Sequence, residues 1–235
     1  MRPGKPMLPT RELTVVSAQD VHPGLRRVIF DTPAFAYRPG QDLVFLLPLP
    51  DGETGRRHYT IRQRDAAGRI AVDFVMHGPT PGPDFARTAR PGDRVSARGP
   101  RGRGTLDATA DWHLILCDET GLPAALHIAE SMAEPARLSV LAEVRDAGWE
   151  QAFPAGVSVE WIHRGAQPPG PNDLILDRLR AWPLPAGRGF AIVTGETSNV
   201  RAQRHLLLDR GFDKTQIASE GYWRPGREGG HDHVH

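Results

Sequence analysis

The segment Arg57-His58-Tyr59-Thr60-Ile61-Arg62 places two arginines, an aromatic ring and a hydroxyl on one short predicted strand. An arginine can bind a diphosphate through two parallel hydrogen bonds, an aromatic ring can cover an isoalloxazine, and a threonine hydroxyl can reach a ring nitrogen. These residue types therefore suit a flavin dinucleotide. Side chains alternate between the faces of a strand, so a twist or bulge is needed for all of them to contact one ligand. The alternative is an ordinary edge strand with solvated arginines.

A second candidate is the turn His77-Gly78-Pro79-Thr80-Pro81-Gly82-Pro83, which follows another predicted strand. We expect a short helix at Asp84–Ala89 whose N-terminal amides face this turn, where a phosphate could bind. A proline-rich loop without a ligand is the alternative.

Two strand-to-helix turns in the second half of the chain are typical of nucleotide binding. The first, Asp118-Glu119-Thr120-Gly121-Leu122-Pro123, follows the apolar strand Leu114–Cys117. The second, Val193-Thr194-Gly195-Glu196-Thr197-Ser198, precedes a predicted helix at Asn199–Arg210. Turns of this kind lie at the carboxyl ends of parallel strands, where open α/β folds bind ligands. If the two strands are neighbours, the turns frame one cleft.

Within the first turn, Thr120 and Gly121 could receive a phosphate or a carboxamide, whereas Asp118 and Glu119 would repel a phosphate. Asp118 or Thr120 could also cap the following helix. The sequence holds neither the Gly-x-Gly-x-x-Gly fingerprint nor a phosphate loop ending in Gly-Lys-Ser/Thr, which argues against a standard Rossmann dehydrogenase. Three arginines, which could instead be solvated, are candidates for the 2′-phosphate of NADPH: Arg164, Arg201 and Arg204.

Glycine, proline and aspartate divide the first half of the chain into short runs that predict strands of a small antiparallel barrel. The predicted strands are Leu13–Ser17, Leu25–Phe30, Asp42–Leu47, His58–Arg62, Arg69–Met76 and Asp93–Arg98.

Strands and helices alternate in the second half, and the apolar strand interiors predict a parallel sheet covered on both faces. The predicted strands are Trp112–Cys117, Leu138–Val144, Val157–Ile162 and Phe190–Thr194, with helices at Leu122–Ala133, Asp173–Trp182 and Asn199–Arg210. We therefore predict an N-terminal six-stranded antiparallel β-barrel (residues 1–107) and a nucleotide-binding α/β domain (residues 108–235), with the boundary at Leu106–Asp111.

Composition narrows the function classes. The chain has 235 residues, 39% of them apolar, which is enough for a buried core, and its net charge of +1 argues against a broad nucleic-acid-binding surface. Cys117 is the only cysteine, so a disulfide within the chain and a cysteine-based metal site are excluded, and a redox cofactor would be held noncovalently. No run of about 18 apolar residues occurs, so we expect a soluble, monomeric, cytoplasmic protein without membrane insertion.

In the order and spacing of its motifs, the chain resembles the siderophore-interacting protein family, flavin-dependent ferric-siderophore reductases related to ferredoxin–NADP reductases. The similarity runs along nearly the whole chain. It is carried by five groups of residues: 57–62; Asp73-Phe74-Val75-Met76-His77-Gly78 with Pro91-Gly92-Asp93; Asp118-Glu119-Thr120-Gly121-Leu122-Pro123-Ala124; Gly195-Glu196; and Gly221-Tyr222-Trp223-Arg224-Pro225-Gly226. The resemblance implies an FAD-binding β-barrel, an NAD(P)H-binding α/β domain and a C-terminal segment that returns to the flavin cleft.

The resemblance also implies roles for single residues. It places Arg57 at the FAD diphosphate, Tyr59 over the flavin ring and Thr60 beside the flavin N5. The remaining cofactor-binding residues that it implies are His58, Arg62, His77, Gly78, Asp118, Glu119, Thr120, Gly195, Glu196, Tyr222 and Trp223. Arg62 and Arg224 are candidates for binding an anionic iron chelate. No protein acid or base is required, because the flavin carries the chemistry.

Three departures from the family pattern concern the substrate. Val44 stands where relatives often have a lysine that helps to hold an anionic siderophore. The predicted helix Leu122–Ala133 lacks the arginine that relatives often carry, and His127 is its only potentially cationic group. Phe85 replaces a tryptophan on a shortened loop. These differences weaken the expectation of a highly charged tris-catecholate substrate.

The resemblance implies an NADPH- or NADH-dependent, FAD-containing reductase of a ferric siderophore or another ferric chelate, releasing Fe(II) in the cytoplasm. One alternative is a general flavin reductase or an electron donor to another protein. A flavin- and iron-chelate-binding protein without turnover is an alternative of a different class. The alternating histidines His231, His233 and His235 could ligate a metal, although a solvated tail is the simpler interpretation.

Overall fold

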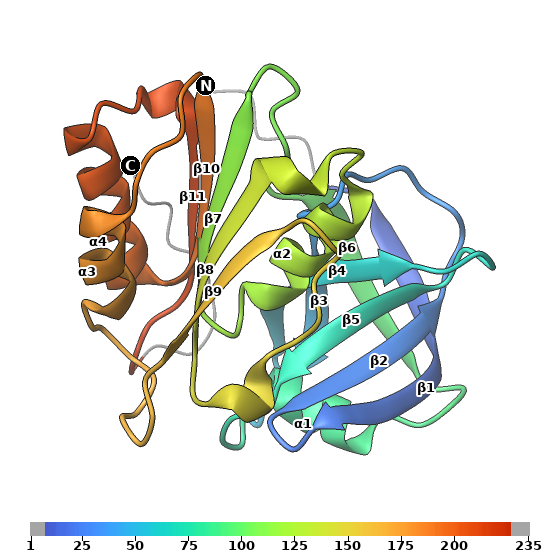
Figure 1. Cartoon of the computed structure of the whole chain (residues 1–235). Coiled ribbons are helices and arrows are strands. Elements are labelled where there is room, and N and C mark those ends of the chain that lie inside the picture. Colours follow the sequence, from blue (N-terminus) through green and yellow to red (C-terminus); the bar gives the residue numbers. More distant parts are fainter. Residues whose placement is uncertain (1–7, 227–235) are drawn as a thin grey trace, which may run out of the picture. The chain divides into compact units, whose positions relative to one another are not determined.

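The computed structural model describes residues 8–226 (Figure 1). These residues form two compact units, one of residues 8–37 with Gln41–Gly102, the other of Arg38–Gly40 with residues 103–226. The domain boundary expected at Leu106–Asp111 falls a few residues after this division. The tail histidines considered as metal ligands lie outside the described residues.

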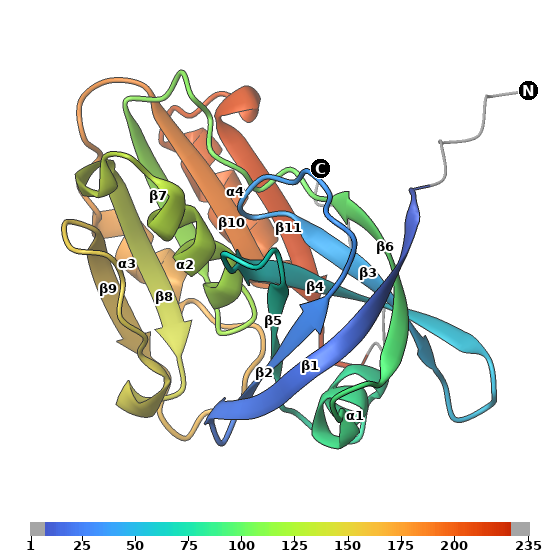
Figure 2. The ribbon, with the colours of Figure 1, turned by 90° about the vertical axis from the view of Figure 1, so that its right-hand side faces the viewer.

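The first unit is a closed barrel of six antiparallel strands in the order β1-β2-β5-β4-β3-β6 (Figure 2). The prediction of a six-stranded antiparallel barrel is confirmed. The first strand is much longer than predicted, because its first part pairs with β6 and its later part with β2, which closes the barrel. The strands are β1 (Thr10–His22), β2 (Leu25–Asp31), β3 (Asp42–Pro48), β4 (Thr54–Arg64), β5 (Ile70–Val75) and β6 (Arg94–Arg101).

The barrel core follows from alternation along its strands. On β3, Leu43, Phe45 and Leu47 are all fully buried and face the interior, as the two-residue period of a strand requires. The helix α1 (Pro81–Thr88) lies across one end of the barrel and adds Ala86 to this core (Figure 2). It starts earlier than the predicted Asp84, because proline fits the first turn of a helix, where its missing N–H has no partner to lose.

The second unit is built on a five-stranded parallel sheet in the order β11-β10-β7-β8-β9 (Figure 1). The prediction of a parallel α/β domain is confirmed. Its central strand is buried at every position, as expected for an apolar strand covered on both faces. The strands are β7 (Trp112–Cys117), β8 (Leu138–Val144), β9 (Ser158–His163), β10 (Gly189–Glu196) and β11 (Ile217–Trp223).

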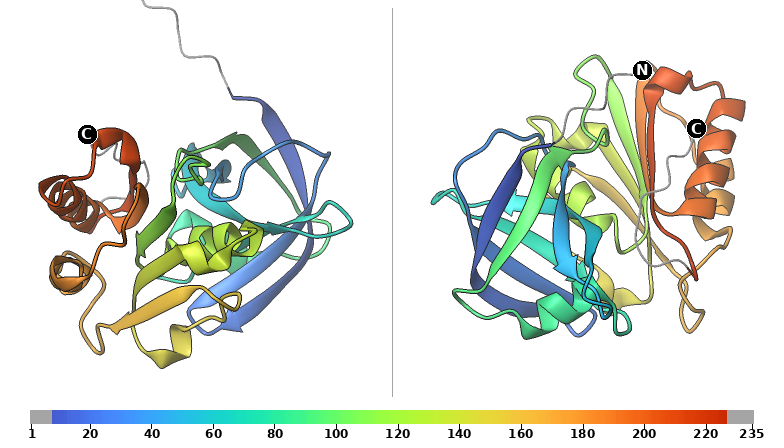
Figure 3. Two further views of the ribbon diagram at one scale, coloured as in Figure 1. Left: turned by 45° about the horizontal axis from the view of Figure 1, so that its top comes forward. Right: turned by 180° about the vertical axis from the view of Figure 1, so that it is seen from behind.

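Helices cover both faces of this sheet (Figure 3). The helices α3 (Leu174–Ala181) and α4 (Thr197–Asp209) pack on one face, and α2 (Leu122–Ser131) packs on the other. Each helix lies within a few residues of its predicted bounds. The three short 3₁₀ turns, at Pro135–Arg137, Ala147–Trp149 and Lys214–Gln216, connect the larger elements.

One strand was not predicted. Edge strand β11 has mixed polarity and an internal glycine, so its sequence lacks a strong strand pattern, and it forms by pairing with the buried strand β10. Among the described residues, no helix is long and apolar enough to cross a membrane.

Candidate functional site

The inward face of β4 carries Tyr59 into a cluster of aromatic rings. Its ring centroid lies 4.1 Å from that of Phe74 and 5.6 Å from that of Phe45. Gly82 of α1 lies against the Tyr59 hydroxyl so closely that a Cβ there would clash with it. Burial raises the pKa of Tyr59 far above its usual value, although Arg57 opposes this shift, so the phenol stays neutral.

The opposite face of β4 carries His58 and Thr60. Thr60 is buried and stands opposite Asp42 in the ladder, and the His58 Nδ1 lies 2.7 Å from the Asp42 Oδ2. The Arg101 Nε is 3.7 Å from the other oxygen of the same carboxylate. The candidate flavin residues therefore occupy two faces of the strand, with Arg57 and Tyr59 on one and His58 and Thr60 on the other.

A bulge, which the sequence requires if all the candidate side chains are to contact one ligand, lies further along β4. The ladder with β5 shifts between Ile61 and Gln63, at Arg62. The Arg62 side chain is buried, with its Nε 4.0 Å from the Asp73 Oδ2, and the same carboxylate accepts two hydrogen bonds from Arg27, of 2.6 and 2.7 Å. Two arginines thus share one buried aspartate, and a chelate would have less access to Arg62 than to an exposed cation.

The N-terminus of α1 is less suited to binding a phosphate than the sequence predicts. Pro81 and Pro83 occupy the first turn and have no N–H to donate, while Asp84 adds a negative charge there. The helix N-terminus therefore has few N–H donors for a diphosphate, and Arg57 is the main candidate to bind it. Its Nη1 donates to the carbonyl oxygen of the neighbouring Arg56, at 3.0 Å. Gly78 has φ +39°, and burial lowers the pKa of His77.

At the carboxyl ends of β7 and β10, Asp118 accepts four hydrogen bonds. Its Oδ1 accepts from the Thr120 amide (2.8 Å) and hydroxyl (2.5 Å). Its Oδ2 accepts from the Glu196 amide (2.9 Å) and the Trp223 Nε1 (2.8 Å). Asp118 thus joins the turns after both strands to the end of β11. It does not cap α2, whose N-cap residue is Gly121 without a side-chain cap, so the prediction that Asp118 or Thr120 caps this helix is wrong.

Beside this turn, Arg164 is buried between two carboxylates. Its Nη1 lies 2.5 Å from the Glu119 Oε1 and 3.6 Å from the Glu143 Oε1. The Asn172 Nδ2 donates to both oxygens of Glu143, at 3.0 and 3.1 Å. Burial raises the pKa of Glu143 to about 7 and also raises the pKa of Glu119. Arg164 is therefore committed to these carboxylates rather than available to a 2′-phosphate.

The turn after β10 retains groups that a ligand could use. Glu196 is buried, and its Oε2 caps α4 by accepting from the Ser198 and Asn199 amides, at 2.8 and 2.9 Å. The Glu196 Oε1 and the Thr194 hydroxyl are buried without a hydrogen-bond partner among the described residues. Gly121 packs directly against that hydroxyl, because a Cβ there would come within 2.4 Å of it. Unpaired buried polar atoms beside a glycine fit a polar ligand such as a nicotinamide nucleotide.

The remaining candidates differ in exposure. Trp223 and Tyr222 are half-buried at the end of β11, and Arg224 follows as an exposed residue. On α4, Arg201 is exposed, whereas Arg204 is buried, with two guanidinium nitrogens unpaired among the described residues. Val44 is buried on β3, and no arginine lies on α2.

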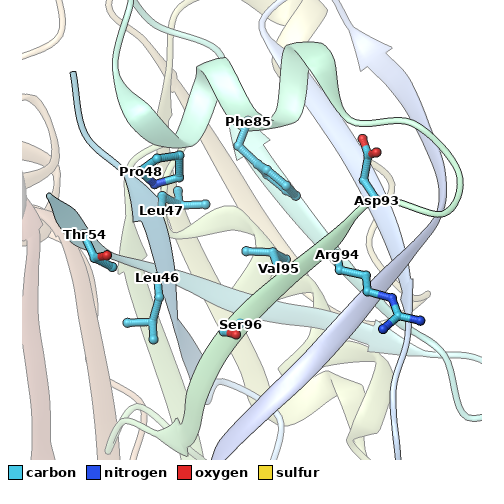
Figure 4. A pocket seen from close by; sticks show the side chains of 9 residues that line it. All are labelled: Leu46, Leu47, Pro48, Thr54, Phe85, Asp93, Arg94, Val95 and Ser96. Atoms are coloured by element: carbon cyan, nitrogen blue, oxygen red, sulfur yellow. The ribbon is translucent and has the colours of Figure 1, made fainter. Parts of the chain in front are cut away.

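A groove of about 550 Å³ opens at the α1 end of the barrel (Figure 4). Its floor is apolar, with Leu47 and Val95 buried, and Asp93 and Arg94 lie at its rim. Its lining includes Phe85 but none of the residues predicted to bind a cofactor. The groove is therefore separate from the candidate flavin residues of β4.

The sequence interpretation missed the acidic partners of this site: Asp42, Asp73 and Glu143. Each is a charged residue within or at the start of an apolar strand, and a buried charge must be paired. That signal was available in the sequence. The identity of each partner was not, because it depends on strand register.

The fold defines a class of protein in which an antiparallel barrel precedes a parallel α/β unit, as in the ferredoxin reductases. A ferredoxin NADP⁺ reductase from Neisseria gonorrhoeae, solved with FAD and NADP, shares the fold with a TM-score of 0.70 and 16% identity, covering 91% of this chain and 99% of that one. A siderophore utilization protein from T. fusca is more similar, with a TM-score of 0.83 and 34% identity over 94% of this chain and 95% of that one.

Two family models match the chain in order: the siderophore-interacting FAD-binding domain over residues 45–104 and the siderophore-interacting protein over residues 110–226. The chain belongs to the siderophore-interacting protein family, and its barrel is an FAD-binding domain. The NADPH-dependent ferric-chelate reductase of Escherichia coli is 26% identical over 91% of this chain and 92% of its own length. The ferric vibriobactin reductase ViuB of Vibrio cholerae is 30% identical over 76% of this chain and 68% of its own length.

Proposed function

We propose that the protein is an NADPH-dependent, FAD-containing reductase of a ferric siderophore or another ferric chelate, which releases Fe(II) in the cytoplasm. The observation that carries this proposal is the similarity to the Escherichia coli ferric-chelate reductase over nearly the full length of both chains. The order of the two units agrees with it, since an FAD-binding barrel precedes a parallel sheet with a ligand-accepting carboxyl edge.

Two residues on one face of β4 would hold FAD: Arg57 would bind the diphosphate, and the neutral ring of Tyr59 would lie against the isoalloxazine. Thr60 lies on the opposite face, so the flavin would have to extend past the edge of the strand for this hydroxyl to reach it. The barrel stabilises this arrangement through the Asp42 contacts on the Thr60 face and the aromatic cluster on the Tyr59 face. When bound, FAD accepts two electrons from a nicotinamide nucleotide and passes them singly to Fe(III).

The nicotinamide nucleotide would bind at the carboxyl edge of the parallel sheet. Gly121 and Thr120 would contact it at the start of α2, and the unpaired Thr194 hydroxyl and Glu196 oxygen would accept or donate hydrogen bonds. The buried carboxylates around Arg164 disfavour a phosphate directly above them. We therefore place the adenosine 2′-phosphate at exposed cations such as Arg201.

Arg224 would attract the anionic chelate, and its exposure suits that role. Oxygen chelators hold Fe(III) far more tightly than the less charged Fe(II), so reduction releases the metal. Buried Val44 and an α2 without arginine leave fewer cations than relatives often have, which favours a chelate of low negative charge. The same observation favours the second candidate function, a general flavin reductase, because free flavin needs no cluster of cations.

The test is anaerobic. The purified protein is examined for a flavin spectrum, and NADPH and NADH oxidation are followed with ferric citrate, a hydroxamate and a tris-catecholate, with Fe(II) captured by a chromogenic chelator. We expect bound flavin, a preference for NADPH, and fastest reduction of the less charged chelates.

Arg224→Ala should raise the KM for an anionic chelate, with Arg180→Ala, an exposed arginine of the same unit, as the control. A colourless protein that binds no added FAD would refute the proposal. Flavin that is reduced but reoxidised only by oxygen or free flavin would leave the general flavin reductase.

A further inference from the structure

Trp223 is held at the end of β11 by both its side chain and its main chain. Its indole Nε1 donates to the Asp118 Oδ2 at 2.8 Å, and its carbonyl oxygen accepts from the Thr197 hydroxyl at 2.9 Å. Asp118 follows β7 and Thr197 follows β10, so turns after two different strands converge on one tryptophan. An edge strand with a partner on one side has few other constraints at its end.

Two glycines make these contacts possible. Gly195 has φ +137°, and a Cβ there would come within 2.6 Å of the Asp118 Oδ2. A Cβ on Gly221 would come within 2.6 Å of the Thr197 hydroxyl. The pairing of β10 with β11 also shifts here, from Gly195 opposite Gly221 to Glu196 opposite Trp223. The shift passes over Tyr222 as a bulge, which re-aims the residues that follow it.

We propose that Asp118 is a positioning residue that acts through the indole of Trp223 to fix the chain at Arg224, and so presents that arginine to an anionic chelate. The inference rests on the proposed function, in which Arg224 binds the chelate. Asp118 cannot attract an anion itself, because it is a buried carboxylate. Because it accepts four hydrogen bonds, it forms a rigid, charge-assisted anchor.

The benefit to binding is entropic. An arginine near a chain end loses conformational freedom when it binds an anion, and a backbone that is already fixed loses less. Anchoring at Trp223 fixes the residue directly before Arg224. If this hydrogen bond served only to stabilise the fold, its removal would lower the overall stability without a specific effect on chelate binding.

The experiment uses the full chain with FAD, compared as wild type, Trp223→Phe, Asp118→Asn and the double variant. Trp223→Phe keeps an aromatic ring and removes the N–H. Trp161→Phe is the matched control, because that indole lies in the same unit and packs beside Phe153, with ring centroids 6.0 Å apart. Two quantities are measured: amide hydrogen exchange of the peptide covering residues 217–226, and the KM and kcat for an anionic ferric chelate.

We expect Trp223→Phe to speed exchange in that peptide about tenfold, the effect of one hydrogen bond to a charged group, and to raise the chelate KM by a similar factor with little change in kcat. The double variant should be no worse than the more affected single variant, because both changes break the same contact. The control should change neither quantity.

Unchanged exchange in Trp223→Phe, or fully additive effects in the double variant, would overturn the inference. Faster exchange with an unchanged chelate KM would also overturn it, since Arg224 would then be held without serving the substrate. A protein that reduces no chelate at all would refute the proposed function, and the exchange measurement would still show whether Asp118 holds Trp223.

Discussion

The two units arrange their buried charges in opposite ways. In the barrel, Arg27 and Arg62 share the single carboxylate of Asp73. In the α/β unit, Glu119 and Glu143 share the single guanidinium of Arg164. The sequence has the same bias, since basic residues outnumber acidic ones in the barrel unit and the reverse holds in the other unit.

This difference matches what each unit would bind. A basic barrel suits the diphosphate of FAD and the negative charge that a reduced flavin carries. An acidic sheet edge repels phosphates, so a nucleotide there would be held mainly by hydroxyls and amides, such as the hydroxyl of Thr194. The near-neutral net charge of the chain therefore hides two regions of opposite sign.

The largest effect is expected when the shared cation is removed. Arg164→Met leaves Glu119 and Glu143 buried without their cation, which should lower the free energy of unfolding by about 3 to 5 kcal/mol at pH 8. Arg27→Met in the barrel should cost less, about 2 kcal/mol, because Arg62 remains beside Asp73. Urea unfolding of both variants measures the difference. Equal losses would show that the two clusters do not differ in the way that their charges indicate.

The second effect concerns the cation that the barrel offers to the cofactor. Arg57→Ala should weaken FAD binding about 100-fold, the loss of a charge-assisted contact of roughly 3 kcal/mol. Arg56→Ala is the control, since it removes a neighbouring exposed arginine of the same strand. Titration of the apoprotein with FAD, followed by flavin fluorescence, gives both affinities. If the control weakened binding as much, the general positive charge of the barrel, rather than Arg57, would hold the diphosphate.

The third effect is a pH dependence that the acidic cluster should show. The pKa of Glu143 is raised from its usual value near 4.5 to about 7, so the folded state holds this proton more tightly than the unfolded state does. The stability contributed by the protonated carboxyl is present below about pH 4.5 and is lost as the pH rises to about 7, a fall of about 1 to 3 kcal/mol.

Glu143→Gln should remove most of this dependence of the unfolding free energy on pH, because an amide does not titrate and can still contact Asn172. A smaller slope should remain from Glu119, whose pKa is also raised. Chemical unfolding from pH 4.5 to 8 measures it. A wild-type protein whose stability rises over this range would contradict the raised pKa.

The contrast between the clusters also shows what the sequence could predict. Spacing and periodicity were sufficient for the six-stranded barrel and the parallel sheet, because these depend on local patterns that repeat along the chain. The pairing of Arg164 was not predictable, since Glu119 follows β7, Glu143 lies in β8 and Arg164 follows β9, and only the sheet order brings the three together. From the sequence alone, Arg164 is therefore a candidate to bind the 2′-phosphate of NADPH.

The same distinction applies to single residues of the site. The bond from the Thr120 amide to Asp118 is local to the turn between a strand and a helix, but the bond from Trp223 to Asp118 joins residues far apart in the sequence. The strand β11 that carries this tryptophan had no clear pattern of its own. Contacts that depend on register or on an edge strand need the whole sheet before they can be assigned.

The smallest effect concerns two barrel arginines, Arg11 and Arg64, that form no ion pair with a carboxylate within residues 8–226. The guanidinium carbon of Arg11 lies 4.1 Å from the ring centroid of Phe35, and that of Arg64 lies 4.8 Å from the same ring. Phe35→Leu removes two cation–π contacts and little volume, so it should cost about 1 to 2 kcal/mol of unfolding free energy. Phe153→Leu in the α/β unit is the control and should cost less, because this ring packs beside Trp161 rather than beneath a guanidinium. If thermal or urea unfolding gave equal losses, the aromatic ring would act only through its apolar area, and the barrel would have to solvate these arginines instead.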